Sequence, residues 1–222
     1  MKFKAYASGS SGNLYSVTDG VSKIMIEAGL PYRKIQKLLG HTLSTFDHCI
    51  VSHKHKDHCK GAGDLANIMG KLWLTYGDDF HDGCSLIRGI EVRAFPVPHD
   101  VPNYGFIFRS VRDKESLVFI TDAFYSPVVF GFSPTIFAIE ANYSKDLLGD
   151  CSYQDRVFQS HMSIDQTIKT LKANDLSKTR EIHLLHLSES HSDEEMFIKE
   201  VQKVTGVMTY AAPKMIKIWT YS

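Results

Sequence analysis

The sequence predicts an α/β fold built as one domain over residues 1–222. Short apolar runs bounded by turn residues recur along the chain, which is the pattern of strands buried in a sheet. Longer segments with apolar residues at helical spacing interrupt these runs, and we find no internal repeat, low-complexity segment or linker. Strands and helices that alternate in this way favour layers of helix packed on sheet, and a chain of this length can bury a substantial core.

Strands are expected at short runs of alternating or continuous apolar character. In residues 2–6 polar and apolar side chains alternate, as in a strand with one buried face. The Ser- and Gly-rich segment 7–13 that follows is either a plain hairpin loop or a loop that lines a site. Further strands are expected at residues 21–27, 46–51, 72–75, 90–97, 104–108, 116–120, 135–140, 181–185, 206–210 and 214–220.

Helices are expected at residues 31–39, 61–69, 164–173 and 193–204. Pro31 suits the first turn of the first of these helices, because its fixed backbone dihedral is already helical there. Ser163 and Ser192 are the expected N-caps of the third and fourth helices, since a hydroxyl can accept a hydrogen bond from an otherwise unpaired amide.

The composition limits the possible functions of the protein and the cellular compartments in which it can occur. The 25 basic and 25 acidic side chains give a formal net charge of zero, so the chain lacks the global basic field of many nucleic-acid binders. The four cysteines form no C-x-x-C pair, and we find neither a secretory signal nor a run of transmembrane length. We therefore expect a soluble cytoplasmic protein with reduced thiols and no membrane partner.

The stretch 53–58 predicts a metal site. It holds three histidines and one aspartate within six residues, directly after an apolar run. Imidazole nitrogen and carboxylate oxygen are ligands that suit zinc, manganese and iron. His53 and His55 stand two residues apart in a loop that leaves a strand, so both can face one ion. Asp57 and His58 follow closely and can face a second ion beside it.

Further candidate ligands stand at the ends of other expected strands. His99 follows the run 90–97 among prolines, and Asp100 beside it can accept a hydrogen bond from a ligand histidine. Asp122 follows the strand 116–120, where a carboxylate can bridge two cations. His186 follows the strand 181–185 and is the expected final ligand.

The H-x-H-x-D-H string at positions 53–58 is the signature of the metallo-β-lactamase superfamily, which the sequence resembles over nearly its full length. The resemblance implies an αββα four-layer sandwich, with the ligand loops converging on one cleft. It also implies two divalent metal ions, zinc or manganese, with iron compatible. By the family's motif order, one ion is held by His53, His55 and His99, the other by Asp57, His58 and His186, with Asp122 between them.

One position discriminates between branches of the superfamily, and another departs from its usual pattern. Asp122 stands where zinc β-lactamases commonly place a cysteine, so the resemblance argues against antibiotic hydrolysis. Glu27 stands where members usually have an aspartate behind the metal ligands. The extra methylene of the glutamate leaves open whether it fills that role.

The segments 140–143, 160–163 and 186–188, together with the loop 7–13, are similar to tRNA-processing zinc ribonucleases and more closely to YycJ-type exonucleases of bacteria and their phage relatives. The resemblance implies that His161 contacts the phosphate or protonates the leaving oxygen and that Glu140 supports it, with Asp57 also in the catalytic set. The expected substrate-binding residues, whose hydroxyls and amides can meet phosphate oxygens, are Ser8, Ser10, Ser11, Asn13 and Ser188.

We therefore expect a dinuclear metal-dependent phosphodiesterase, most simply an exonuclease-like nuclease that uses a metal-activated water. A phosphodiesterase that opens cyclic nucleotides is an alternative, because the same ions and acid would serve it. A thioesterase or lactonase is a further one, although it would leave His161 and Glu140 without a task. No G-x-S-x-G turn suggests a serine hydrolase. The resemblance implies a bacterial or phage-infected cell, and dimerisation among similar proteins leaves a homodimer open.

Overall fold

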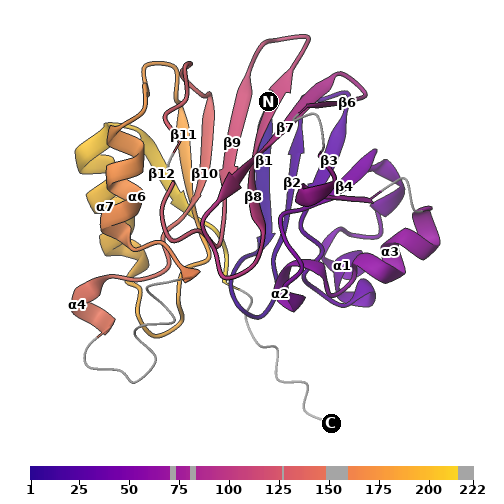
Figure 1. Ribbon diagram of the computed structural model, residues 1–222, viewed down its shortest axis with the longest axis horizontal. Helices are drawn as coiled ribbons and strands as arrows, with labels where there is room; N and C mark the ends of the chain where they lie inside the picture. Colours follow the sequence, from indigo (N-terminus) through magenta and orange to yellow (C-terminus); the bar gives the residue numbers. More distant parts are fainter. Residues whose placement is uncertain (71–73, 81–83, 127, 149–159, 215–222) are drawn as a thin grey trace.

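Two β-sheets lie face to face, and helices cover the outer face of each sheet (Figure 1). This computed structural model describes residues 1–70, 74–80, 84–126, 128–148 and 160–214. The expected strand 214–220 therefore lies almost wholly outside the described residues, as do the first two residues of the expected strand 72–75. The four layers confirm the predicted αββα sandwich.

Among the described residues, the first sheet has five strands in chain order, and the first ligand loop follows the fourth of them. β1, β2 and β3 pair antiparallel, whereas β4 and β5 continue the sheet parallel to β3. Its strands are β1 Lys2–Ala7, β2 Leu14–Thr18, β3 Lys23–Ile26, β4 His48–Val51 and β5 Leu74–Tyr76.

The second sheet has seven strands in the order β12-β11-β10-β9-β8-β7-β6. β9 to β12 are parallel to one another, and β6 to β9 pair antiparallel. Its strands are β6 Ser85–Ile87, β7 Ile90–Val97, β8 Asn103–Ser110, β9 Ser116–Ile120, β10 Ile136–Glu140, β11 Glu181–Leu185 and β12 Met208–Ala211. β6 is short and was not expected, because its residues lie in a polar segment.

Helices flank the two sheets on opposite sides (Figure 1). The α-helices are α1 Tyr32–Leu38, α2 Lys56–Cys59, α3 Ala62–Met69, α4 Lys145–Leu148, α6 Ile164–Lys172 and α7 Glu194–Thr205, and the 3₁₀ turns are Leu43–Thr45 and Gly77–Asp79. Among the helices of the described residues, none has both the length and the apolar character that a membrane span requires.

The four layers follow from strands that are apolar on both faces. In β9, Leu117 and Phe119 pack between the sheets, whereas Val118 and Ile120 pack toward α6 and α7. In the first sheet, Met25 and Cys49 face the other way, toward α1 and α3. Continuous apolar runs are the pattern of strands buried on both faces, which is why these strands show no alternation in sequence.

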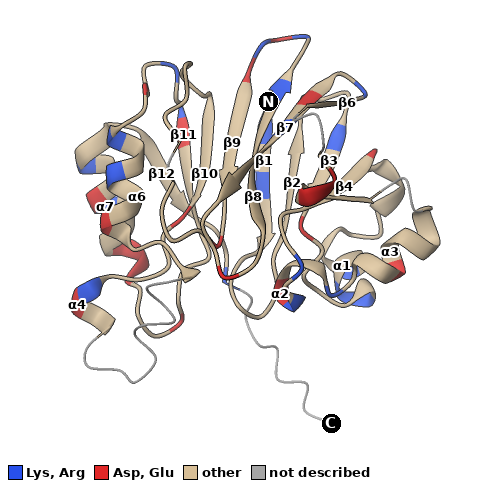
Figure 2. Cartoon of the chain, in the orientation of Figure 1, with Lys and Arg blue, Asp and Glu red and all other residues tan. Residues whose placement is uncertain are grey.

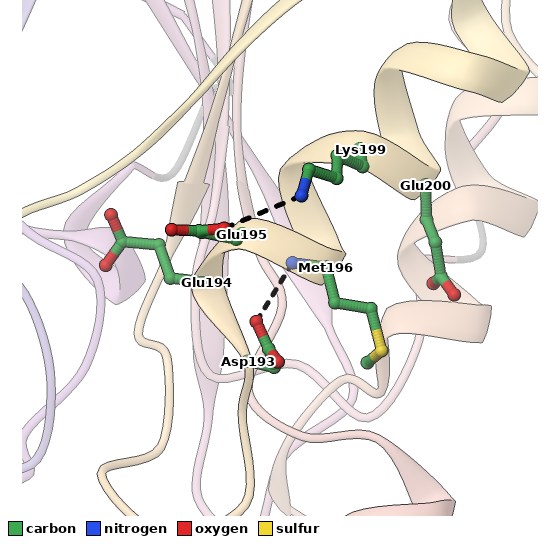
Figure 3. A pocket seen from close by; sticks show the side chains of 6 residues that line it. All are labelled: Asp193, Glu194, Glu195, Met196, Lys199 and Glu200. Atoms are coloured by element: carbon green, nitrogen blue, oxygen red, sulfur yellow. Dashed lines mark hydrogen bonds and ion pairs between the residues drawn. The ribbon is translucent and has the colours of Figure 1, made fainter.

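Side chains cap both long helices. Ser163 accepts a hydrogen bond from the amide of Gln166 and caps α6, as predicted. The prediction for α7 was wrong by one residue: Asp193, not Ser192, is the cap, and its carboxylate accepts from the amide of Met196 (Figure 3). Ser192 instead donates to the carbonyl of Ser188 at 2.5 Å, which ties the helix start to the strand-end loop. Acidic residues in the first turn of α7 lie at the positive end of the helix dipole and stabilise the helix there (Figure 2).

The parallel arrangement brings several strand ends to one edge of the molecule. In the first sheet, β3 and β4 are parallel, and in the second sheet β9, β10 and β11 are parallel. β7 has the same direction as β9, because β8 pairs antiparallel with both. Ligands in open α/β sheets bind outside the carboxyl ends of the strands. The residues that follow these strand ends are therefore the ones that build a site.

Candidate metal centre

The structure brings the seven expected ligands together at this edge. His53 and His55 lie in the loop after β4, and Asp57 and His58 lie in the short helix α2. The other three each follow a strand of the second sheet, namely His99 after β7, Asp122 after β9 and His186 after β11. The two sheets thus contribute to one centre.

Three histidines form the first group. One ring nitrogen from each of His53, His55 and His99 lies within 4.8 Å of the others. Nε2 of His99 is 3.2 Å from Nδ1 of His55, and the ring of His53 packs edge-on against both. Three imidazoles that converge in this way have the donor set of a transition-metal site.

The opposite ring nitrogens of these histidines have partners in the protein. Nδ1 of His53 is 2.9 Å from the hydroxyl of Ser52, and Nδ1 of His99 is 3.1 Å from the carbonyl of Ser160. Oδ1 of Asp100 is 3.5 Å from Nε2 of His55 and 3.0 Å from Nε2 of His99. Such outer partners fix the orientation and tautomer of a ligand histidine, so His53 and His99 direct Nε2 inward and His55 directs Nδ1 inward.

Two histidines and two carboxylates form the second group, Asp57, His58, Asp122 and His186. Nε2 of His58 is 3.0 Å from Oδ2 of Asp122, and Nε2 of His186 is 3.5 Å from Oδ1 of Asp122 and from Oδ2 of Asp57. Oδ2 of Asp122 is also 3.8 Å from Nε2 of His53. The carboxylate of Asp122 therefore lies between the two groups.

These residues fit divalent cations. Nε2 of His53 and Nε2 of His186 are buried without a hydrogen-bond partner, although buried polar atoms are nearly always paired. Burial and the neighbouring His58 lower the pKa of His53 to about 2, so its ring is neutral and able to donate a lone pair. Burial works against ionisation of Asp57, but the adjacent His186 and His58 hold its pKa well below the usual range. Neutral imidazoles and ionised carboxylates are the forms that bind metal.

Glu27 lies behind the second group, where the superfamily usually has an aspartate. Its Oε2 is 3.3 Å from Nδ1 of His58, and both side chains are fully buried. The amide of Ser52 donates to both of its carboxylate oxygens, at 3.3 and 3.4 Å. Burial would lower the pKa of His58, but the carboxylates of Asp122 and Glu27 raise it well above its usual value. The surroundings of His58 thus favour positive charge.

Three strand-end residues of the centre have left-handed backbone. The φ angles of Glu27, Asp122 and His186 are 65°, 48° and 54°. Non-glycine residues seldom adopt this conformation, and it occurs where the surrounding structure enforces it. The Nδ2 of Asn103 donates to the carbonyls of Thr121 and Asp122 at 3.0 and 2.6 Å and so holds one of these turns. Sequence reasoning missed Asn103, and nothing in its local pattern signals this contact.

His161 and Glu140 form a hydrogen-bonded pair beside the second group. Nδ1 of His161 is 2.8 Å from Oε1 of Glu140, and Oε2 of Glu140 accepts from the amide of Ala123 at 2.8 Å. The ring of His161 stacks on that of His186, with centroids 5.1 Å apart. Burial alone would lower the pKa of His161, but Glu140 raises it to about 9. These carboxylate surroundings favour the protonated form of the ring.

The expected substrate-binding residues fall into two sets. Ser8 and Asn13 are buried. The hydroxyl of Ser8 accepts from the amide of His186 at 2.7 Å, and Nδ2 of Asn13 donates to the carbonyl of Asp57 at 3.1 Å. In contrast, three of the expected residues line an open hollow beside His161 and His186: Ser10, Ser11 and Ser188. The first set thus holds the backbone of the candidate ligands, whereas in the second set Ser10 and Ser11 are exposed and Ser188 is half-buried.

Asn142 is a further residue of the centre that we did not single out. Its Nδ2 donates to the carbonyl of His186 at 2.7 Å and lies 3.1 Å from Nδ1 of the same residue. These contacts fix the orientation of the His186 ring from outside the centre. Its place in the segment 140–143, directly after Glu140, was the available signal.

The whole chain was compared with known proteins. No family model matches the chain. The chain is 28% identical over 239 residues to exodeoxyribonuclease WalJ of Streptococcus pneumoniae serotype 2, a match that covers 93% of this chain and 87% of the relative. It is 24% identical to exodeoxyribonuclease YycJ of Bacillus anthracis, over 92% of this chain and 89% of the relative.

Among solved structures, the metallo-β-lactamase fold protein YhfI from Bacillus subtilis is similar with a TM-score of 0.73 at 15% identity, over 96% of this chain and 97% of that chain. Fold and site thus define a metal-dependent hydrolase with the metallo-β-lactamase fold. Within that class, the relatives confirm the predicted resemblance to the YycJ-type branch.

Proposed function

We propose that the chain is a dinuclear, metal-dependent exodeoxyribonuclease, which hydrolyses phosphodiester bonds at the ends of DNA. The hydrogen-bonded pair of His161 and Glu140 beside the ligand groups is the observation that carries this proposal. It supplies a proton donor for a leaving oxygen, which a poor leaving group such as a sugar hydroxyl needs. The exodeoxyribonuclease names of two relatives that match nearly the full chain support DNA as the substrate.

In this proposal the first ion is held by His53, His55 and His99, and the second by Asp57, His58 and His186, with Asp122 shared between them. When bound, two such cations activate water and neutralise the charge that develops on phosphoryl oxygens. The residues around the ligands position them. Glu27 orients His58, Asn142 orients His186, and Ser8 and Asn13 hold the backbone at His186 and Asp57.

The hydrolytic step balances without any co-reactant besides water. The oxygen of water forms a bond to phosphorus while the bond from phosphorus to the leaving oxygen breaks. His161 gives its proton to that oxygen, and Glu140 stabilises the charged ring before transfer. A positioned general acid of this kind contributes roughly 10²–10⁴-fold to the rate. We place His161 and Glu140 in the catalytic set on these grounds, and Asp57 because it is a proposed ligand of the second ion.

A phosphodiesterase that opens cyclic nucleotides is the second candidate. The chain has no net charge to attract a polyanion, and the hollow beside His161 has the volume of a small-molecule site. The two candidates differ in substrate and share the chemistry. Location in the cytoplasm and assembly into a homodimer stay predictions.

Turnover of DNA against turnover of cyclic nucleotides tests the proposal. Linear single-stranded and duplex DNA, structured RNA and a panel of cyclic nucleotides are incubated with the protein and added manganese or zinc. Release of nucleotides from DNA with cyclic nucleotides intact supports the exonuclease. Turnover of cyclic nucleotides alone would replace it with the second candidate.

A further inference from the structure

A polar hollow of about 390 Å³ opens beside the candidate metal centre. Its wall comes from three strand-end segments: the turn at Ser10 and Ser11 after β1, Asn142 after β10, and residues 186–191 after β11, with His161 from the segment before α6. A volume of this size falls within the roughly 300–1,000 Å³ of small-ligand sites. The hollow therefore has the size of a site for one nucleotide.

The position of His161 relates the hollow to the reaction, and this step rests on the proposed function. A general acid must lie within hydrogen-bond reach of the oxygen that it protonates. His161 lines the hollow, so the group that leaves after cleavage occupies it. In an exonuclease that group is either the terminal nucleotide or the shortened polymer, and the size of the hollow favours the terminal nucleotide.

The wall of the hollow is rich in groups that suit a phosphate. Ser10 and Ser11 are exposed, and the ring of His191 is fixed through Nδ1, 3.0 Å from the hydroxyl of Ser190. Nζ of Lys214 donates to the carbonyl of Ser188 at 2.8 Å and so places a positive charge behind the loop. Hydroxyls, an imidazole and a nearby ammonium are hydrogen-bond partners that phosphate oxygens favour.

Ser188 acts on the loop rather than on the hollow. Its hydroxyl oxygen accepts from the amide of His191 at 3.2 Å and from the amide of Ser190 at 3.4 Å. These bonds set the turn that presents His191. Among the described residues that line the wall, Glu189 is the one with a carboxylate, and it is exposed, so its charge opposes an anion.

We propose that this hollow holds the terminal nucleotide during cleavage and that Ser10, Ser11 and His191 contact its terminal phosphate. If the leaving oxygen is O3′, that phosphate is on the 5′ end of the strand; if it is O5′, the phosphate is on the 3′ end. In both cases the hydroxyls and the imidazole meet the same dianion. A terminal phosphate on the matching end thus strengthens substrate binding without entering the chemical step.

The first experiment compares oligodeoxynucleotides of one sequence with a 5′ phosphate, a 3′ phosphate or neither. For the unmodified protein, one of the two terminal phosphates lowers KM about tenfold or more with little change in kcat, because hydrogen bonds to a charged group are strong. His191→Ala and the double variant Ser10→Ala/Ser11→Ala lose most of that advantage. Equal KM values for the three substrates would overturn the proposal.

A substitution at Glu189 should strengthen binding of the phosphorylated substrate, whereas the previous variants weaken it. Glu189→Gln removes the opposing charge and lowers KM for the phosphorylated substrate about two- to fivefold, while KM for the unphosphorylated substrate stays constant. Glu200→Gln is the matched control, since it removes the same charge from an exposed position further along α7 (Figure 3). Equal effects of the two variants would contradict a local role for the hollow.

Binding measurements separate this proposal from the proposed function. Calorimetry compares thymidine 5′-monophosphate, thymidine 3′-monophosphate and thymidine on the metal-loaded protein and on His191→Ala, after circular dichroism and metal content show that the variant is intact. Tighter binding of one monophosphate that His191→Ala weakens supports the hollow even if no DNA is cleaved. Cleavage of DNA without any such difference leaves the function standing and removes the hollow from it.

Discussion

Nδ1 of His161 lies 2.8 Å from Oε1 of Glu140, and the side chain of Glu140 is completely buried. This contact favours the charged form of the imidazole, because a carboxylate without solvent interacts strongly with a neighbouring cation, while burial raises the pKa of Glu140 itself. The charged ring stands against His186, at the border of the ligand groups and the open hollow. In the proposed function this ring gives its proton to the leaving oxygen.

Replacing His161 tests the role of this donor. His161→Ala should lower kcat on DNA by roughly 10²–10⁴-fold with unchanged metal content, because the leaving sugar oxygen loses its acid. The same variant should hydrolyse bis(p-nitrophenyl) phosphate almost as fast as the unmodified protein, since p-nitrophenolate leaves without a proton. Single-turnover rates on both substrates give the comparison. Equal losses on both would show that His161 acts through the centre itself.

Replacing Asp57 or His58 tests whether these residues serve the reaction or only the stability of the fold. Asp57→Asn and His58→Ala should abolish hydrolysis of both substrates, since each removes a proposed ligand of the second ion. The fold should survive, because the apolar layers do not depend on these side chains. Circular dichroism, metal analysis and activity on each variant provide the test. Full activity in either variant would remove that residue from the ligand set.

Glu27 offers a test of the outer contacts. Glu27→Gln keeps the shape of the side chain but removes the charge that faces Nδ1 of His58. Loss of such an outer partner typically lowers metal affinity about 10–100-fold. Competition with a chromophoric chelator measures the affinity. An unchanged affinity would mean that burial alone orients His58.

A pH effect is expected far from the centre, at Asp19. Burial opposes ionisation of this carboxylate, but the amides of Ser22 and Val21, which donate at 2.7 and 2.9 Å, hold its pKa below the usual range. A carboxyl whose folded pKa is depressed stabilises the fold above its unfolded pKa and loses that contribution as pH falls through the folded value. The stability difference between the unmodified protein and Asp19→Asn should therefore shrink below about pH 4. Chemical denaturation across this range, with a chelator present, measures it; a constant difference would contradict it.

The sequence predicts the layers well because local patterns determine them. Continuous apolar runs such as 116–120 and 136–140 are strands buried on both faces, and each observed strand of the ligand loops coincides with an expected one. The cap of α7 was misplaced by one residue because Ser192 and Asp193 are both good caps, and only the backbone decides between them. The short strand β6 forms through pairing with β7, which no local pattern reveals.

The candidate site, like the fold, has one part that the local sequence reveals and another part that depends on tertiary contacts. The spacing of His53, His55, Asp57 and His58 is visible in one short stretch, so sequence alone identifies it. The buried contacts of Ser8 and Asn13 depend on residues far along the chain, His186 and Asp57, and their placement beneath the centre could not be read from the loop itself. The left-handed backbone at Asp122 is likewise a product of tertiary contacts, because the carbonyls around it are held by Asn103.

The measurement that tests the central claim most directly is nucleotide release from DNA by metal-loaded and metal-stripped protein. Stripped protein should be inactive, and added manganese or zinc should restore steady release of nucleotides from DNA ends while cyclic nucleotides stay intact. DNA that remains whole with both metals, under conditions where the protein is folded and metal-loaded, would contradict the account.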